Sequence, residues 1–225
     1  MNLEFIGIGG AFCPGLGCNC AYIKENKKIL FIDFGMDAFA KVIKYNLLDD
    51  VEEVYIIVTH FHGDHIGGLF TLVDYCYFNM NIVVRILDNS FTFTNKLVNL
   101  MELTGIESRR FAIKQKFEFN FDFDVKIEKT SHSPLLECYS IVFEKDGKKV
   151  LYTSDSNDIN NVRKAIKDDS FEKIYCEVGE NSPIHIDYYE LKNLDKAKLI
   201  LMHFSSEELY EIAKNDGFVV PNYLK

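Results

Sequence analysis

Three of the six histidines in this chain share one short run, His60-Phe61-His62-Gly63-Asp64-His65. The first two histidines of the run are separated by one residue, so in an extended segment their side chains point the same way and can hold one ion. The aspartate and the last histidine come after a glycine turn and can face a second ion. Neutral imidazole is a favoured zinc ligand, and a carboxylate among histidines allows two ions to share one site. The run therefore predicts a metal-dependent hydrolase.

The other three histidines stand singly, as His132, His185 and His203. Two of them, His132 and His203, directly follow apolar segments with strand character, and so does Asp155. Side chains at the ends of strands converge along one rim of a sheet, where the backbone is rigid and loops supply substrate contacts. We expect these residues to join the histidine run at such a rim.

The segments that must position these residues are mostly strand-like. Strands are predicted at Leu3–Ile8, Ala21–Lys24, Ile29–Phe34, Val54–Thr59, Ile82–Ile86, Phe111–Phe119, Val125–Thr130, Tyr139–Glu144, Val150–Thr153, Ile174–Val178 and Leu199–Met202. Helices are predicted at Asp37–Tyr45, Ile66–Phe78, Phe91–Thr104, Ile159–Lys167 and Glu207–Asn215, with a short helical turn at Asp187–Lys192. Asp146-Gly147 between two strand-like runs predicts a hairpin. Many strands in series with a few helices favour two packed sheets with helices outside.

Size and charge limit the function. At 225 residues, the chain has room for one substantial core, and without a linker or repeat we expect one domain, residues 1–225. The net charge of -9 disfavours binding to long nucleic acid, because proteins that grip its backbone usually carry a basic face. The densest basic stretch is Arg109-Arg110 with Lys114 and Lys116, which we interpret as a solvated strand edge.

The start of the chain and its cysteines favour a cytoplasmic protein. The segment 1–7 does not resemble a signal peptide, and no apolar stretch approaches the ~20 residues that cross a bilayer, so no membrane partner is expected. Three cysteines lie singly in apolar segments and are predicted to be core residues: Cys76, Cys138 and Cys176. Three others cluster in one loop, as Cys13, Cys18 and Cys20. Their spacing differs from that of paired zinc cysteines, so we favour reduced loop thiols over an extra metal site or a redox role.

The run His60–His65 resembles the H-x-H-x-D-H signature of the metallo-β-lactamase superfamily. The later ligands follow in that family's order, as His132, Asp155 and His203. The opening is similar too, with a glycine-rich loop at Gly7–Gly17 and a strand that ends in Asp33-Phe34-Gly35. The likeness spans nearly the whole chain, from Leu3 to His203. It implies an α+β fold, a four-layer αββα sandwich of two mixed sheets flanked by helices.

The resemblance also implies the ligand assignment. His60, His62 and His132 would bind a first zinc ion, and Asp64, His65 and His203 a second, with Asp155 bridging the two. The only cofactors expected are therefore two zinc ions per chain, although ligand identity also admits manganese or iron. Two ions ~3.5–4 Å apart would polarise a shared water and supply hydroxide for hydrolysis. Asp64 is assigned to the catalytic set as well as to the metal.

His185 lies outside the general ligand pattern of the family. The branch that contains ribonuclease Z and related phosphodiesterases has a histidine shortly before the last ligand, where it acts as a general acid toward the leaving oxygen. By this resemblance His185 is the second catalytic residue, and Glu177 is a candidate to orient it. The alternative is a hydrogen-bonded histidine with a structural role.

The substrate favoured is a small nucleotide phosphodiester, such as a cyclic nucleotide, with stacking on an aromatic residue such as Phe12, Tyr22 or Phe61. Members that process tRNA carry a basic first loop and a tRNA-binding arm, and neither is found here. The alternatives are a ribonuclease Z-like RNA 3′-end endonuclease, a thioester or lactone hydrolase, and a metal-binding protein without catalysis. Related phosphodiesterases commonly dimerise, so we expect a homodimer in which Ile66–Phe78 and the first loop approach the partner.

Overall fold

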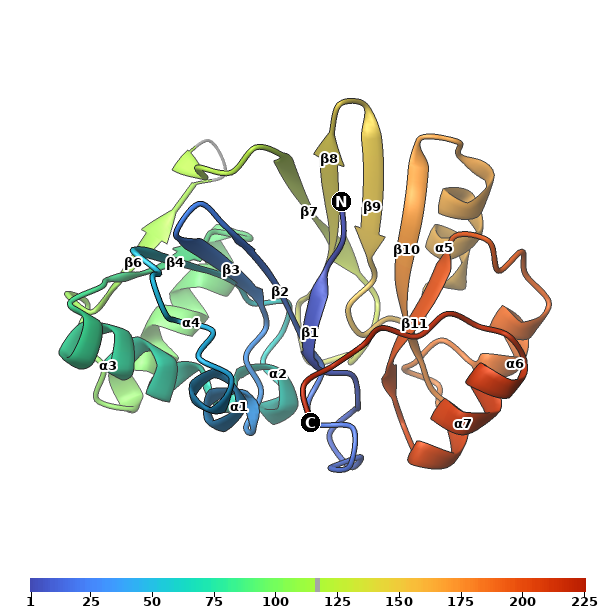
Figure 1. Cartoon of the computed structure of the whole chain (residues 1–225), viewed down its shortest axis with the longest axis horizontal. Helices are drawn as coiled ribbons and strands as arrows, with labels where there is room; N and C mark the ends of the chain where they lie inside the picture. Colours follow the sequence, from blue (N-terminus) through green and yellow to red (C-terminus); the bar gives the residue numbers. More distant parts are fainter. Residues whose placement is uncertain (116–117) are drawn as a thin grey trace. The chain divides into compact units, whose positions relative to one another are not determined.

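A computed structural model of the chain describes residues 1–115 and 118–225. The described residues form two compact units (Figure 1). The amino-terminal unit comprises Asn2–Gly7, Cys18–Asn120 and Tyr223–Lys225, and the carboxyl-terminal unit comprises Met1, Ile8–Gly17 and Phe121–Asn222. Each unit contains one mixed β-sheet together with its own helices.

The amino-terminal unit is built on a six-stranded sheet with the order β1-β2-β3-β4-β5-β6. Its strands are β1 (Glu4–Gly7), β2 (Cys20–Glu25), β3 (Lys28–Ile32), β4 (Glu53–Ile57), β5 (Val84–Leu87) and β6 (Phe111–Lys114). The first three strands pair antiparallel, and β3 to β6 pair parallel. After a first charged residue, both β3 and β4 are buried runs of apolar or aromatic residues, as expected for central strands of a sheet.

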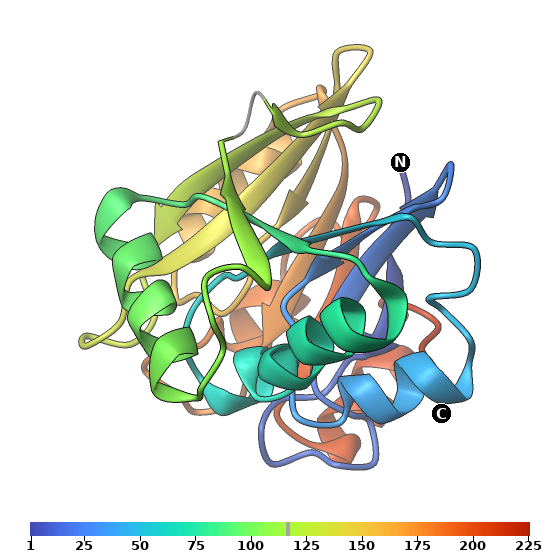
Figure 2. The same ribbon diagram turned by 90° about the vertical axis from the view of Figure 1, so that its left-hand side faces the viewer.

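Helices connect the parallel strands of this sheet. They are α1 (Ala38–Lys44), α2 (Gly63–Ile66), α3 (Leu69–Met80) and α4 (Phe91–Leu103). Figure 2 shows α1, α3 and α4 packed along one face of the sheet. Helix α4 begins at a capping serine, Ser90, whose side chain accepts a hydrogen bond from the backbone N–H of Phe93.

The carboxyl-terminal unit is built on a five-stranded sheet with the order β11-β10-β9-β8-β7. Its strands are β7 (Asp124–Thr130), β8 (Cys138–Lys145), β9 (Lys148–Tyr152), β10 (Phe171–Val178) and β11 (Leu199–Phe204). Pairing is antiparallel from β7 to β9 and parallel from β9 to β11. The helices are α5 (Ile159–Lys167), α6 (Tyr188–Lys192) and α7 (Glu207–Asn215).

The hairpin predicted at Asp146-Gly147 is confirmed. Lys145 pairs with Lys148, and the two residues between them have φ values of +51° and +74°. Positive φ at both central positions defines the type I′ turn, which matches the twist of an antiparallel pair. The predicted α+β fold with two mixed sheets flanked by helices is also confirmed.

The elements follow the sequence prediction with small shifts at their ends. Helix α2 was not predicted, because four residues are too few to show a helical period. The strand predicted at Phe111–Phe119 appears as β6 up to Lys114, and residues 116–117 lie outside the described part of the chain. Among the described helices, none has the length and apolar character of a membrane span.

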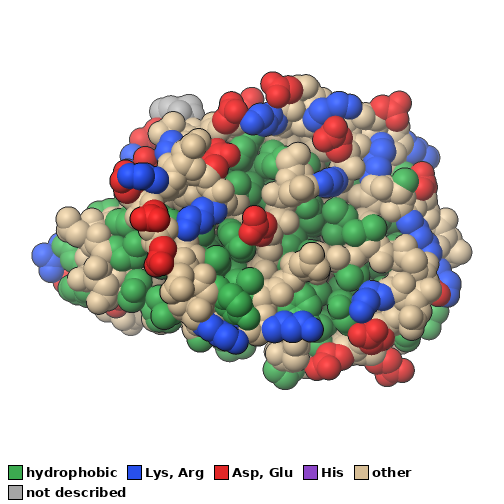
Figure 3. All heavy atoms as spheres, in the orientation of Figure 1, with side chains coloured by type: hydrophobic (Ala, Val, Ile, Leu, Met, Phe, Trp, Pro, Cys, Tyr) green, Lys and Arg blue, Asp and Glu red, His purple; other side chains and the backbone are tan. Residues whose placement is uncertain are grey.

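The basic stretch at β6 is neutralised locally. Arg110 forms an ion pair with Asp74, and Lys114 forms one with Glu118, while Lys116 lies outside the described residues. Strand β6 is at the edge of its sheet, as interpreted, but the Arg110 side chain is only 13% exposed and so is not solvated. On the face drawn in Figure 3, the acidic and basic side chains of the described residues are interspersed.

Candidate metal centre

The histidine run lies directly after β4, where the chain leaves the amino-terminal sheet. His60 and His62 approach each other, with His60 Nε2 3.1 Å from His62 Nδ1. The segment is extended up to His62, whose ψ is 150°, and α2 begins at the next residue. An extended backbone places alternate side chains on one side, which is why these two imidazoles converge.

Asp33 orients two of the histidines through one buried network. Its carboxylate accepts hydrogen bonds from the backbone N–H of Thr59, from the Thr59 hydroxyl and from His65 Nδ1, each at 2.7 Å. Because the hydroxyl proton of Thr59 is donated to Asp33, the Thr59 oxygen accepts from His60 Nδ1 at 3.1 Å. Both His60 and His65 are thereby held as Nδ1–H tautomers, which leaves Nε2 of each ring with its lone pair.

The Asp33 carboxyl is completely buried. Burial raises its pKa, and the hydrogen bonds from His65 and Thr59 act in the opposite direction. His65 Nε2, the ring nitrogen that keeps its lone pair, lies 3.5 Å from Asp64 Oδ2. A buried imidazole lone pair and a carboxylate oxygen therefore face each other in this unit.

Glycine is required where this loop packs against the segment after β3. A Cβ at Gly35 would lie 2.2 Å from the carbonyl oxygen of Asp64, and a Cβ at Gly68 would lie 2.4 Å from the carbonyl oxygen of Gly35. Phe34 N also donates to the carbonyl oxygen of His65 at 2.6 Å. Only glycine allows these backbones so close, so the Asp33-Phe34-Gly35 motif positions the histidine run through its backbone as well as through the hydrogen bonds of Asp33.

The carboxyl-terminal unit gathers its own set of predicted ligands around Asp155, which follows β9. Asp155 Oδ2 lies 3.6 Å from His132 Nε2, and Asp155 Oδ1 lies 3.3 Å from His203 Nε2. His132 Nδ1 donates to the carbonyl oxygen of Ile184 at 2.7 Å, so its Nε2 keeps the lone pair. All three side chains are buried.

Left-handed backbone occurs at three positions next to or within these sets. Asp33 has φ +61°, Ser154 has φ +55° and His203 has φ +53°. Each lies at the end of a strand, and at the last of these positions the pairing between β10 and β11 also shifts register. A left-handed backbone conformation costs a non-glycine residue roughly 1–2 kcal/mol of conformational free energy. Such strain concentrates at functional sites.

His185 is held by Glu177, a fully buried carboxylate at the end of β10. Glu177 Oε2 accepts from His185 Nδ1 at 3.0 Å, while Glu177 Oε1 accepts from the backbone N–H groups of Ile186 at 2.7 Å and Ser156 at 3.2 Å. This hydrogen bond occupies His185 Nδ1, and the His185 side chain is 21% exposed. One ligand atom each of Asp155, His185 and His203 lies within 4.8 Å of the others.

The pKa of Glu177 is raised by burial, and the hydrogen bond from His185 opposes this effect. The sequence offered Glu177 as a candidate to orient His185, on weak evidence because it is one of 34 acidic residues. Its burial and its three hydrogen bonds now identify it as the residue that positions His185.

The donor set in each unit fits divalent metal ions. Oriented imidazole nitrogens face carboxylate oxygens at 3.3–3.6 Å, in the pairs His65–Asp64, His132–Asp155 and His203–Asp155. A lone pair and an anionic oxygen at this separation repel unless a cation or a proton lies between them. Buried histidines held by carboxylates and carbonyls are the usual environment of a protein-bound metal.

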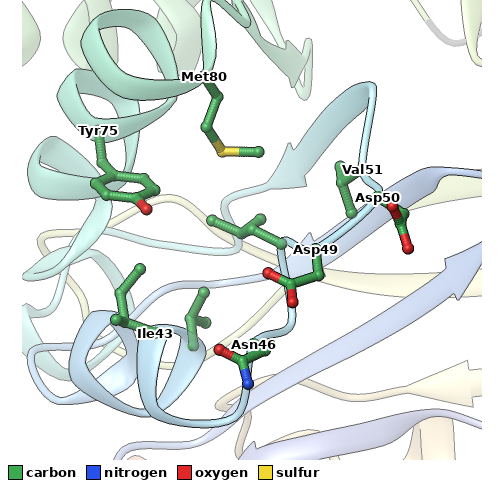
Figure 4. Close-up of a pocket in the computed structure, with 9 residues that line it drawn as sticks. Ile43, Asn46, Asp49, Asp50, Val51, Tyr75 and Met80 are labelled. Atoms are coloured by element: carbon green, nitrogen blue, oxygen red, sulfur yellow. The ribbon is translucent and has the colours of Figure 1, made fainter.

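A separate hollow of about 500 Å³ lies in the amino-terminal unit, between α1, the α1–β4 connection and α3 (Figure 4). Ile43, Tyr75 and Met80 supply an apolar wall, and Asp49 and Asp50 lie at its border. The described elements that line this hollow are different from those that carry the histidine run.

Solved structures similar to this chain define its fold. YhfI of Bacillus subtilis, a metallo-β-lactamase fold protein, matches 99% of this chain and 96% of its own with a TM-score of 0.74 at 18% identity. A diphosphatase of the PhnP family has a TM-score of 0.72 at 14% identity over 99% of this chain and 95% of its own. The short form of human tRNase Z has a TM-score of 0.67 at 16% identity over 100% and 98%. The chain therefore has the metallo-β-lactamase fold.

The family follows from sequence relatives. The model of the family described as "Anti-Pycsar protein Apyc1" matches residues 1–220. Relatives with that name include one from Saccharibacillus brassicae, 27% identical over 92% of this chain and 91% of its own. Another, from Paenibacillus harenae, is 24% identical over 91% and 90%. The chain belongs to the anti-Pycsar Apyc1 family, whose members are cyclic-nucleotide-degrading proteins of the metallo-β-lactamase type. The predicted class, a metal-dependent hydrolase that acts as a phosphodiesterase, is confirmed.

Proposed function

We propose that this chain opens the phosphodiester ring of 3′,5′-cyclic nucleotides by hydrolysis at a site that holds two zinc ions. The match to the Apyc1 family over residues 1–220 carries this proposal. The oriented imidazoles and carboxylates of the two units support it, because they are the donors that such a site requires.

The ligand assignment is part of the proposal. His60, His62 and His132 would hold one ion, Asp64, His65 and His203 would hold the other, and Asp155 would contribute to both. The proposal also treats residues 1–225 as one catalytic domain. When bound, the two ions polarise a water molecule and stabilise negative charge on the phosphate oxygens.

His185 supplies the proton that the leaving oxygen needs. Opening a cyclic nucleotide breaks a bond to an alkoxide, which is a poor leaving group unless it is protonated. The hydrogen bond from His185 Nδ1 to Glu177 leaves Nε2 as the atom that carries this proton. Glu177 is buried and held by two backbone N–H groups, so it fixes the ring and favours its charged form.

Charge near the ligands favours a small substrate over RNA. Helix α7 begins with Glu207 and Glu208, shortly after His203. Two carboxylates at this position repel a polyanion, and the net charge of -9 adds to this effect. A cyclic mononucleotide carries one phosphate charge and is affected less.

The same proposal includes a cytoplasmic enzyme that forms a homodimer. All six cysteines are free thiols, which persist in a reducing compartment. The first loop and α3 are the segments expected to approach a partner, and α3 presents an exposed aromatic ring, Phe78, at 63% exposure.

Turnover of four substrate classes tests the function. Purified protein of known metal content is incubated with 3′,5′-cyclic nucleotides, bis(p-nitrophenyl) phosphate, precursor tRNA and an acyl thioester, each with and without a chelator. We expect metal-dependent hydrolysis of the cyclic nucleotides, loss of activity with chelator, and recovery when zinc is added back. Cleavage of precursor tRNA alone would assign an RNA endonuclease instead, and hydrolysis of the thioester alone would refute a phosphodiesterase.

A further inference from the structure

The first loop of the carboxyl-terminal unit, residues 8–17, is a closed loop. Its ends are joined by hydrogen bonds from Ile8 N to the Leu16 carbonyl oxygen at 3.1 Å and from Gly9 N to the Gly17 carbonyl oxygen at 2.7 Å. Cys13 and Leu16 are buried, each 3% exposed. Paired ends and buried side chains hold this short loop in one conformation. Loops of this kind are frequently functional.

The loop is fastened beside a proposed metal ligand. Gly10 N donates to the carbonyl oxygen of Phe204, and Phe204 N donates to the carbonyl oxygen of Ile8, both at 2.9 Å. A Cβ at Gly10 would lie 3.1 Å from Cε1 of His203, so the loop backbone lies against this imidazole. The loop is therefore part of the immediate surroundings of His203.

Phe12 lies at the tip of this loop, and its side chain is 95% exposed. A residue spans at most ~3.6 Å of chain, so the Cα of Phe12 is within ~7 Å of the Cα of Gly10. Phe12 is thus two residues along the chain from the point where the loop lies against His203. A single exposed phenylalanine says little by itself, but one fixed next to a reaction centre is placed to meet the substrate.

The other two aromatic residues predicted as candidates for stacking, Tyr22 and Phe61, already contact other side chains of the amino-terminal unit. Tyr22 is 5% exposed, and its hydroxyl donates to Glu4 Oε2 at 2.5 Å. Phe61 lies parallel to Phe93, with a centroid distance of 4.3 Å and an interplanar angle of 19°. Phe61 therefore helps to anchor the histidine run on α4, and Tyr22 belongs to the core.

We propose that Phe12 is the residue that binds the nucleobase, by stacking its ring on the face of the base. This inference rests on the proposed function, because it requires a nucleotide whose phosphate lies beside His203 and His185. Stacking on an aromatic ring tolerates every base, since each has a π-face. The site should therefore accept purine and pyrimidine cyclic nucleotides, with tighter binding of purines because of their larger rings.

Steady-state kinetics of Phe12→Ala and Phe12→Trp test the inference. The substrates are cyclic AMP, cyclic UMP and ribose 3′,5′-cyclic phosphate without a base. We expect Phe12→Ala to raise KM for cyclic AMP about tenfold, the lower range of base stacking, with kcat within about twofold of the wild-type value. Phe12→Trp should restore KM, and the preference for cyclic AMP over the base-free substrate should fall about tenfold in Phe12→Ala.

Phe78→Ala serves as the matched control, because it removes another exposed aromatic ring, near the carboxyl end of α3. Size-exclusion chromatography with light scattering is recorded for every variant. An equal loss on cyclic AMP and on the base-free substrate overturns the inference, and so does a loss that follows dissociation of an oligomer. Wild-type protein that does not hydrolyse cyclic nucleotides at all refutes the proposed function instead, and the inference falls with it.

Discussion

Removal of the His185 imidazole separates its chemical role from its structural one. In the structure its Nδ1–H donates to Glu177, and its side chain is 21% exposed. After His185→Ala, Glu177 keeps its hydrogen bonds from Ile186 N and Ser156 N. The expected cost in the free energy of unfolding is ~1–3 kcal/mol, the range for loss of one partner of a buried polar group.

The expected cost in activity is larger. A general acid contributes typically ~10²–10⁴-fold to the rate, which corresponds to ~3–5 kcal/mol in the activation free energy. The loss should depend on the leaving group, because p-nitrophenolate is a stable anion and does not need a proton. We expect turnover of cyclic AMP to fall by ~10²–10⁴-fold in His185→Ala, and hydrolysis of bis(p-nitrophenyl) phosphate to fall much less.

The assay compares kcat for both substrates in the wild type, His185→Ala and Glu177→Gln, with metal content measured by mass spectrometry. Glu177→Gln should show the same leaving-group dependence, because its single amide oxygen cannot accept both from His185 and from the backbone N–H groups of Ile186 and Ser156. His132→Ala is the control for a ligand and should lose metal. Equal losses on both substrates, or a zinc content that falls with activity in His185→Ala, would refute an acid role and make His185 a ligand.

Other contacts allow further tests. Asp33→Asn should weaken zinc binding by roughly 10–100-fold, because it disturbs the tautomer of His65; competition with a chromophoric chelator measures this, and an unchanged affinity would contradict the orienting role. Burial raises the pKa of Cys18 to about 11, so its thiol stays protonated at pH 8 and iodoacetamide should leave it unmodified in the folded protein; rapid labelling, located by peptide mass spectrometry, would revive a redox or metal role for the loop cysteines. Gly147→Ala should lower the free energy of unfolding in urea by about 1 kcal/mol, because alanine is strained at φ +74°, and no change would argue against the type I′ turn. Ser90→Ala should also cost ~1 kcal/mol through loss of the α4 cap, and both variants should retain wild-type metal content.

The strands and the order of the ligand motifs could be read from local patterns. An apolar run such as Val54–Ile57 predicts a buried strand by itself. Asp146-Gly147 between two strands favours a turn with positive φ at both residues. The run from His60 to His65 is equally local, since its chemistry depends on spacing within six residues. These features needed no knowledge of distant parts of the chain.

The roles of single polar and aromatic side chains were decided by tertiary contacts. In the sequence Glu177 is only one of many carboxylates. In the fold it is buried, two backbone N–H groups hold its carboxylate, and the same carboxylate accepts a hydrogen bond from His185. Phe61 and Phe12 look alike in the sequence, yet one packs on Phe93 and the other is left exposed at the tip of a closed loop. The physical reason is that a side chain's pKa, tautomer and exposure depend on neighbours far away in the chain, whereas strand and turn preferences arise from the residue's own backbone and its nearest neighbours.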